Sequence, residues 1–225
     1  KSILSVYEEY TVLAFRYTST VKNVAQDLLW AFQVDFISYL DSRLTLLKGC
    51  KVQKFFDGMW NSIRGDVLEG LRQSVHTGRL VITGISLGGA LSCLSYVDIA
   101  DQEYSAMFKF HFGAPRVGNS AWAQWFDQIT PSTRYFIKAD PIAFLPRCLT
   151  PVCNYKQTGT AYICDKTKEV CTKKVKSEDT QLTDSEKYIN DFIEAVNEHY
   201  NEDDGNVDGI IDHIVGYKKI LQYTR

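Results

Sequence analysis

One short stretch of the sequence has the residue types of a nucleophilic site. Ser86 lies between Gly84 and Gly88 in the heptapeptide GISLGGA, after a β-type run and before a helix-type run. In such a strand-to-helix turn the hydroxyl is presented outward, and the glycines remove Cβ atoms that would clash. A serine hydroxyl is a weak nucleophile at neutral pH, so Ser86 needs a base, a group that orients the base, and donors for an oxyanion.

The glycine pattern is open to other interpretations. A glycine-rich strand-to-helix turn with no catalytic role fits the five-residue pattern alone. A phosphate-binding loop does not fit, because the Lys-Ser/Thr pair of a P-loop and the spacing of GxGxxG are both missing. If Ser86 reacts, the helix that follows directs free N–H groups toward the developing negative charge. The backbone N–H of Leu87 can then serve as an oxyanion donor.

Three histidines that follow Ser86 are candidates for the base. His111 lies between two phenylalanines in a strand pattern, which is typical of a structural sheet residue. His199 comes late in an amphipathic helix pattern, where an imidazole is usually solvated or packed. His213 follows a loop rich in Asp, Asn and Gly, and it is the best candidate for the base.

Asp140 is the best candidate for the orienting acid. It follows the strand-like run RYFIK and precedes Pro141, so it lies at the carboxyl end of a strand. Active-site residues of α/β folds lie at that edge of the sheet. Asp98 and Asp101 belong to the helix after Ser86, and the later acids fall in charged, loop-like segments.

Strand and helix patterns alternate along the chain. Runs rich in β-branched and aromatic residues predict strands at residues 11–17, 52–56, 79–85, 108–112 and 134–137. Apolar residues at helical spacing predict helices at 59–75, 87–97, 122–126, 184–200 and 212–223. This alternation predicts an α/β fold, a three-layer sandwich around a mostly parallel central sheet.

Length and charge limit the classes of protein to consider. At 225 residues with 45% hydrophobic residues, the chain is predicted to form a single domain over 1–225. A formal net charge of −2 provides no general attraction for nucleic acid or an anionic membrane. No apolar stretch approaches the roughly eighteen residues of a spanning helix. The chain opens on Lys1, so we expect it to have been processed or trimmed at the N-terminus.

Six cysteines suggest disulfide bonds. Four of them crowd into one Lys- and Thr-rich stretch that has the pattern of loop and hairpin, and the preferred local pairs are Cys148 with Cys153 and Cys164 with Cys171. Cys50 and Cys93 are either free or paired elsewhere. An oxidising, secretory environment follows from this prediction.

No metal or cofactor is expected. A zinc site is the competing interpretation of the cysteines, but their separations fit poorly with the tight pairs that zinc modules favour. The acidic stretch 202–208 lacks the spacing and the terminal glutamate of an EF-hand, so a solvated loop is favoured over a calcium site.

A strongly amphipathic helix is predicted directly after the first strand. From Val21 to Phe32 one face is apolar and the other carries charged and amide side chains. The plainest interpretation is an ordinary helix packed on the sheet, and its strong amphipathicity leaves a second role open.

Four motifs together resemble those of the class 3 lipase family, which includes the lipases of filamentous fungi. They are TGISLGGALS around Ser86, HFGAPRVGN at 111–119, KADPIAFLP at 138–146 and DHIVGY at 212–217. The resemblance runs from about Val12 to Tyr217. It implies an α/β-hydrolase fold with Ser86 as nucleophile, Asp140 as orienting acid and His213 as general base.

The resemblance adds a second oxyanion donor and a lid. The segment FRYTSTVKNVAQDL is similar to the family segment in which a Ser or Thr donates to the oxyanion and a lid helix follows. This implies that Thr18 is the second donor and that the helix from Val21 to Phe32 is the lid, which could bury its apolar face at a lipid–water interface. The chain departs from the family pattern at Tyr17, usually glycine, and at Ile85, commonly histidine.

The leading functional hypothesis is a secreted serine hydrolase that cleaves carboxylic esters of lipids, most simply an acylglycerol lipase, through an acyl-enzyme. A phospholipase or a soluble-ester hydrolase of the feruloyl type is the alternative in the same class. A non-catalytic, lipase-like interaction module is the alternative from a different class.

Overall fold

The central element of the fold is a seven-stranded sheet. In this computed structural model the described residues are 2–16, 33–38, 45–74, 78–100, 106–137, 140, 142–146, 154–165 and 170–174. The strand order is β1-β2-β5-β6-β8-β10-β11. Their bounds are Ser2–Val6 (β1), Thr11–Phe15 (β2), Arg79–Ile85 (β5), Ala106–Phe112 (β6), Ser132–Ile137 (β8), Thr160–Asp165 (β10) and Val170–Lys174 (β11).

The inner part of this sheet is parallel, as predicted. β2, β5, β6, β8 and β10 pair in parallel, and only the two outer pairings among the described strands, β1 with β2 and β10 with β11, are antiparallel. Because parallel strands end at the same edge, the segments after β5, β6 and β8 meet there. Sequence patterns therefore predicted β2, β5, β6 and β8, while β1, β3, β7 and β9 were not predicted and β10 fell in a stretch expected to form loop and hairpin.

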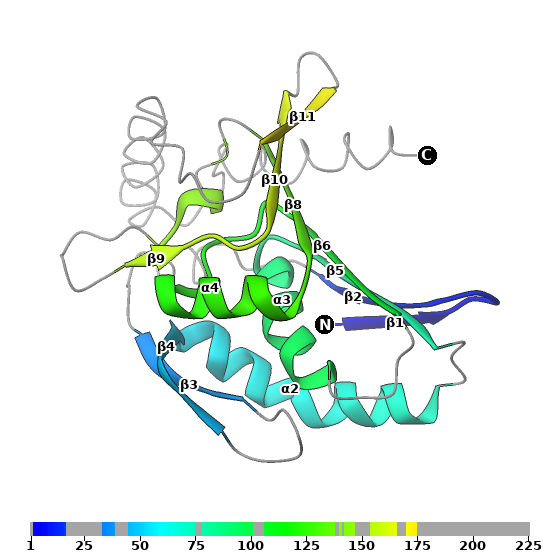
Figure 1. Ribbon diagram of the computed structural model, residues 1–225. Helices are drawn as coiled ribbons and strands as arrows, with labels where there is room; N and C mark the ends of the chain where they lie inside the picture. The colour runs from blue at the N-terminus through cyan, green and yellow to red at the C-terminus, as the bar shows by residue number, and fades with distance from the viewer. Residues whose placement is uncertain are drawn as a thin grey trace, which may run out of the picture.

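Three helices cover one face of the sheet (Figure 1). They are α2 at Lys54–Gln73, α3 at Leu87–Ile99 and α4 at Ser120–Ile129. Burial alternates along β5, where Leu80 and Ile82 are fully buried beneath the helices. Every residue of α3 is buried, so this helix is the centre of the main hydrophobic core.

The predicted strand at 52–56 is wrong in its second half. The strand β4 spans Thr45–Gln53, and α2 begins at Lys54. The side chain of Gln53 accepts hydrogen bonds from the backbone N–H groups of Phe55 and Phe56, which caps the helix. Phe56 was counted as a strand residue, but it begins the buried helical stripe that continues through Trp60.

A smaller, four-stranded sheet lies beside the helices. Its order is β3-β4-β7-β9, with β3 at Gln33–Ser38, β7 at Gly118–Asn119 and β9 at Tyr155–Lys156. All its pairings are antiparallel. Asn119 joins this sheet to α4: its Oδ1 accepts from the N–H groups of Lys51 (3.1 Å) and Trp122 (2.9 Å), and its Nδ2 donates to the carbonyl of Gly49 (2.8 Å).

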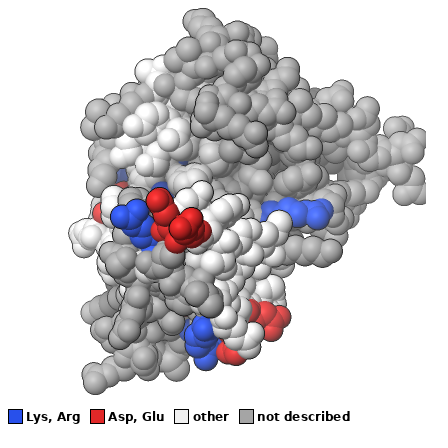
Figure 2. Space-filling view, turned by 90° about the vertical axis from the view of Figure 1, so that its right-hand side faces the viewer, with Lys and Arg blue, Asp and Glu red and all other residues white. Residues whose placement is uncertain are grey.

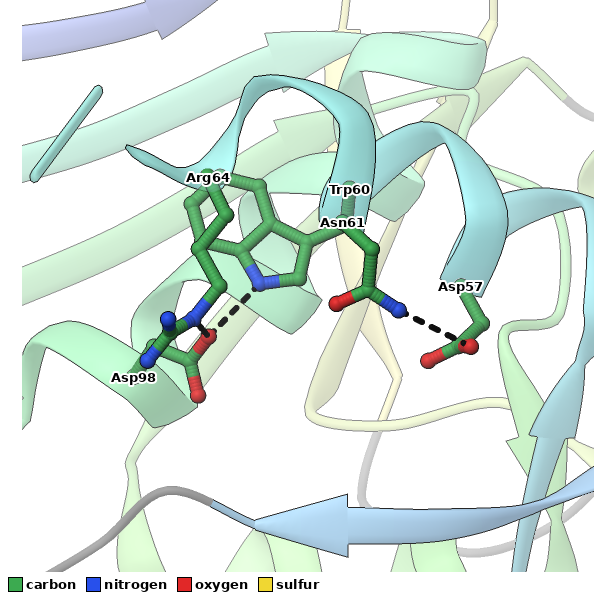
Figure 3. Close-up of polar contacts among 5 residues, drawn as sticks. All are labelled: Asp57, Trp60, Asn61, Arg64 and Asp98. Atoms are coloured by element: carbon green, nitrogen blue, oxygen red, sulfur yellow. Dashed lines mark hydrogen bonds and ion pairs between the residues drawn. The ribbon is translucent and has the colours of Figure 1, made fainter. Parts of the chain in front are cut away.

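A buried carboxylate joins α2 to α3 (Figure 3). Oδ2 of Asp98 accepts hydrogen bonds from Trp60 Nε1 at 2.7 Å and from Arg64 Nε at 2.6 Å. The Asp98 side chain is 3% exposed and that of Arg64 is 27% exposed, so the ion pair is largely shielded from water. Two donors on one oxygen satisfy a charge whose burial would otherwise be costly.

The cysteine predictions are partly tested. Cys50 and Cys93 are buried and free. Cys164 is disulfide-bonded, and the β10–β11 register places Cys171 directly opposite it. This register is what the predicted local pair requires. Cys148 and Cys153 lie outside the described residues.

The described surface carries no broad patch of one charge on the face drawn in Figure 2, where basic and acidic side chains form small groups. No described helix is both long enough and apolar enough to cross a membrane.

Asn119→Ala should lower the free energy of unfolding by about 1–3 kcal/mol, because it removes a helix cap and leaves two partly buried backbone groups of β4 without their partner. Asn119→Asp keeps the acceptor and loses only the donor, so its loss should be smaller. Urea unfolding of both variants tests this. Equal losses in the two variants would contradict the role given to the cap.

Asp57→Asn should stabilise the protein at neutral pH. Desolvation and the nearby negative charge of Asp98 raise the pKa of Asp57, while its hydrogen bond from Asn61 opposes the rise. A folded-state pKa above the unfolded value, about 3.9, means that stability falls as pH rises from that value through the raised pKa. The variant should therefore have a larger free energy of unfolding than the parent above this pH window and the same free energy of unfolding below it.

Urea unfolding at several pH values measures this difference. Asp66→Asn is the matched control, since Asp66 is exposed on the same helix. A variant at Asp57 that loses stability at neutral pH would show that the attraction of this first-turn carboxylate to the helix N-terminus is the larger effect.

Candidate active site

Ser86 occupies a tight turn between β5 and α3. Its backbone has φ 55° and ψ −125°, and it is the only non-glycine residue at positive φ in the described part of the chain. Its N–H donates to the carbonyl of Phe112 at 2.9 Å, and its carbonyl accepts from the N–H of Gly89 at 2.8 Å. A positive φ is unfavourable for a serine backbone and persists only where surrounding contacts enforce it. Such strained residues are concentrated at functional sites.

Close backbone contacts explain the glycines around Ser86. A Cβ on Gly84 would overlap the carbonyl of Gly88, and a Cβ on Gly88 would overlap the carbonyl of Phe15. A Cβ on Gly89 would lie 2.5 Å from the Cβ of Ala114. No side chain fits at these positions without movement of the backbone, so the sequence pattern around Ser86 is a steric requirement of this turn.

The start of α3 presents backbone N–H groups that no helix carbonyl accepts, as the prediction for Leu87 requires. Leu87 is the first residue of this 13-residue helix, so its N–H is one of the N-terminal groups that lack a partner within the helix. The end of β2 lies against the same point, because a Cβ on Gly88 would also lie 2.9 Å from the carbonyl of Arg16. Thr18, the second predicted donor, follows two residues later and lies outside the described residues.

Asp140 lies at the same edge of the sheet as Ser86. It follows β8, its side chain is buried, and the residue is 3% exposed. Its Oδ1 accepts from the N–H of Ile142 at 3.0 Å, and its own N–H donates to the carbonyl of Ile137 at 3.0 Å. These contacts hold the carboxylate in one orientation at the turn η2, Ile142–Phe144.

One strand separates the elements that carry Ser86 and Asp140. The order β5-β6-β8 places β6 between them. Neighbouring strands are about 4.8 Å apart, so the ends of β5 and β8 are about 10 Å apart. An imidazole that hydrogen-bonds to both groups fits a gap of that size. The predicted base, His213, lies outside the described residues, as do the histidine at 199 and the predicted lid from Val21 to Phe32.

His111 has a different environment. It is 1% exposed on β6, and neither ring nitrogen has a hydrogen-bond partner among the described residues. Burial, together with the positive charges of Lys109 and Arg134, holds the pKa of His111 well below its usual range. A neutral imidazole on the helix-covered face of the sheet is in line with the structural role expected for it.

One residue that contacts the site region had no signal in the sequence. The side chain of Gln157 donates from Nε2 to the carbonyls of Ala114 (3.0 Å) and Ala143 (2.8 Å). Nothing in the spacing or type of a lone glutamine between β9 and β10 predicts these contacts. Among the described residues no cluster of three or more His, Cys, Asp or Glu side chains could hold a metal ion.

Comparison with known proteins agrees with this geometry. Residues 12–150 match the family model described as Lipase (class 3). The chain is 29% identical over 138 residues to the secreted mono- and diacylglycerol lipase A of Penicillium cyclopium, an alignment covering 60% of this chain and 42% of that protein. It is 26% identical over 180 residues to the lipase of Rhizopus oryzae, covering 74% of this chain and 42% of that protein.

Solved structures of fungal lipases share the fold. The triacylglycerol lipase of Penicillium expansum matches with a TM-score of 0.65 and 19% identity over 76% of this chain and 67% of its own. A mutant of the Penicillium cyclopium enzyme matches with a TM-score of 0.63 and 23% identity over 84% of this chain and 73% of its own. The chain thus has the α/β-hydrolase fold of these enzymes, although it spans only about four tenths of the length of the curated relatives it matches.

The family model covers more than half of the chain and includes both Ser86 and Asp140. The protein belongs to the class 3 lipase family.

Proposed function

We propose that the protein is a serine carboxylic-ester hydrolase that cleaves acylglycerol esters through Ser86, His213 and Asp140. The observation that carries the proposal is the turn at Ser86, where a strained serine is surrounded by glycines that admit no side chain. Membership of the class 3 lipase family and the names of the relatives support an acylglycerol substrate. Secretion is supported by relatives named as secreted proteins.

In the first half of the reaction, Ser86 Oγ attacks the ester carbonyl carbon while His213 takes the hydroxyl proton. The carbonyl oxygen becomes an oxyanion, and the N–H groups of Leu87 and Thr18 donate to it. The bond to the alcohol then breaks, and the imidazolium returns its proton to the leaving oxygen. The products are an acyl ester on Ser86 and a free alcohol.

In the second half, water attacks the acyl-enzyme as His213 removes a proton from it. A second oxyanion forms and collapses, the bond to Ser86 Oγ breaks, and that oxygen regains a proton from the imidazolium. Asp140 orients the imidazole and stabilises its charged form throughout. The buried, hydrogen-bonded state of this carboxylate suits that role, because a fixed carboxylate needs little reorganisation when the imidazole becomes charged.

The predicted helix from Val21 to Phe32 completes the proposal as a lid. Its apolar face would cover the site in solution and would be buried in the lipid surface at an interface. The partner is therefore a lipid ester presented at a lipid–water interface. This proposal involves no nucleic acid, no metal and no cofactor.

Ser86→Ala should lower kcat by about 10⁴- to 10⁶-fold, because no other group can form the acyl-enzyme. Fatty-acid release from emulsified mono-, di- and triacylglycerols measures this, and a fluorophosphonate probe should label the parent and not the variant. Ser62→Ala, at an exposed serine of α2, is the matched control. A folded parent that is neither labelled nor active would favour the non-catalytic interaction module.

Ester hydrolysis should rise when the substrate passes its solubility limit. Below that limit the lid is expected to stay closed, and the emulsified lipid surface should then favour the open state. Rates for short-chain and long-chain esters on both sides of the limit test this, with Ser86→Ala as the background. A rate that saturates below the limit and does not rise above it would favour a soluble-ester hydrolase.

A further inference from the structure

The amide of Gln157 bridges the segment that follows β6 and the turn η2 that follows Asp140. Gln157 lies between β9 and β10, and its Nε2 has two N–H donors. One donor bonds the carbonyl of Ala143 at 2.8 Å, and the other bonds the carbonyl of Ala114 at 3.0 Å. Ala143 and Ala114 are 2% and 3% exposed, so solvent provides little replacement for either bond.

The first carbonyl belongs to the loop that holds the acid. Ala143 is the central residue of the turn η2, and the preceding residue, Ile142, donates its N–H to Oδ1 of Asp140. A displacement of Ala143 would therefore move the donor that orients the carboxylate. One peptide unit, between Ile142 and Ala143, separates the bonded carbonyl from the N–H that the carboxylate accepts.

The second carbonyl belongs to a segment packed against the serine helix. Ala114 follows β6, and its Cβ lies where a side chain on Gly89 of α3 would have to be. Gly89 in turn donates its N–H to the carbonyl of Ser86. Ala114 is thus placed relative to the serine turn by direct packing. A second hydrogen bond joins the same two segments: the N–H of Arg116 donates to the carbonyl of Leu145 at 2.6 Å.

We propose that Gln157 is a positioning residue for Asp140: its amide holds the acid loop at a fixed distance from the serine turn. The inference rests on the proposed function, since it assigns a task to Gln157 within that site. Gln157 does not touch the reacting atoms and acts through the backbone of Ala143 and Ile142. Misplacement of a catalytic group by about 1 Å can lower a rate on the order of 10²-fold.

Gln157→Leu removes both donors and keeps a side chain of similar size. We expect kcat to fall about 10- to 100-fold with KM changed less than about twofold, because the loss concerns the charged transition state and not substrate binding. A displaced Asp140 stabilises the imidazolium less, so the pKa of the base should fall. The acidic limb of the kcat/KM profile should accordingly move to lower pH.

Gln157→Glu is the second variant, since a carboxylate of the same shape cannot donate to either carbonyl when ionised. Gln124→Glu, at an exposed position of α4, introduces the same charge and should leave kcat and the pH profile unchanged. If Gln157→Leu and Gln157→Glu both fail to fold, the bridge is a requirement of the fold and the positioning role is overturned.

A double variant separates this proposal from the proposed function. With Asp140→Asn present, Gln157→Leu should cost little further activity, because both changes act on the same group. If the two changes instead lower kcat independently, so that their effects multiply, the role of Gln157 is overturned while that of Asp140 stands. A folded Gln157→Leu variant with the parent's kcat and pH profile would have the same meaning. Full activity of Asp140→Asn alone would overturn the proposed function, and the inference with it.

Discussion

The rest of the site depends on a close approach of three pieces of backbone at the end of β5. The carbonyl of Gly88 lies against Gly84, and the carbonyl of Phe15 lies against Gly88, at distances that leave no room for a Cβ. This contact joins the end of β2, the end of β5 and the start of α3 at one point. Because the three segments cannot separate without losing core packing, Ser86 stays in a left-handed conformation that a serine would not otherwise adopt.

The same edge of the sheet connects the Ser86 turn to Asp140. Main-chain bonds connect Ser86 to Phe112, and Gly113 to Tyr135, so each strand end is tied to the next. Beyond β8 the chain turns back at Asp140, whose carboxylate is held by the N–H of Ile142. Ser86 and Asp140, two members of the proposed triad, thus lie at the same edge of one hydrogen-bonded sheet. This is the arrangement that electrostatic catalysis requires, since donors and charges must be in position before the reaction begins.

The helix layer provides the support for that edge. α3 is buried along its whole length, and its far end is fixed to α2 by Asp98, which accepts from Trp60 and Arg64. The fold is that of fungal lipases of known structure, and the family is the class 3 lipases. A buried lysine also lies between the sheet and the helix layer: Nζ of Lys109 on β6 is 5.0 Å from the ring centre of Phe126 on α4. That cation–π contact partly offsets the burial of the charge.

Local patterns in the sequence determined four of the five parallel strands (β2, β5, β6 and β8), the helix that begins at Leu87, and Ser86 and Asp140 as candidates, because strand periodicity and glycine spacing are local properties. They misassigned 54–56, where the Gln53 cap and the buried stripe of α2 outweighed the β-type composition. Only the tertiary structure revealed the hydrogen bonds of Gln157 and Asn119. Their partners are backbone groups that every residue type carries, and these were brought close by the packing of segments that lie far apart in the chain, so no residue pattern could indicate them.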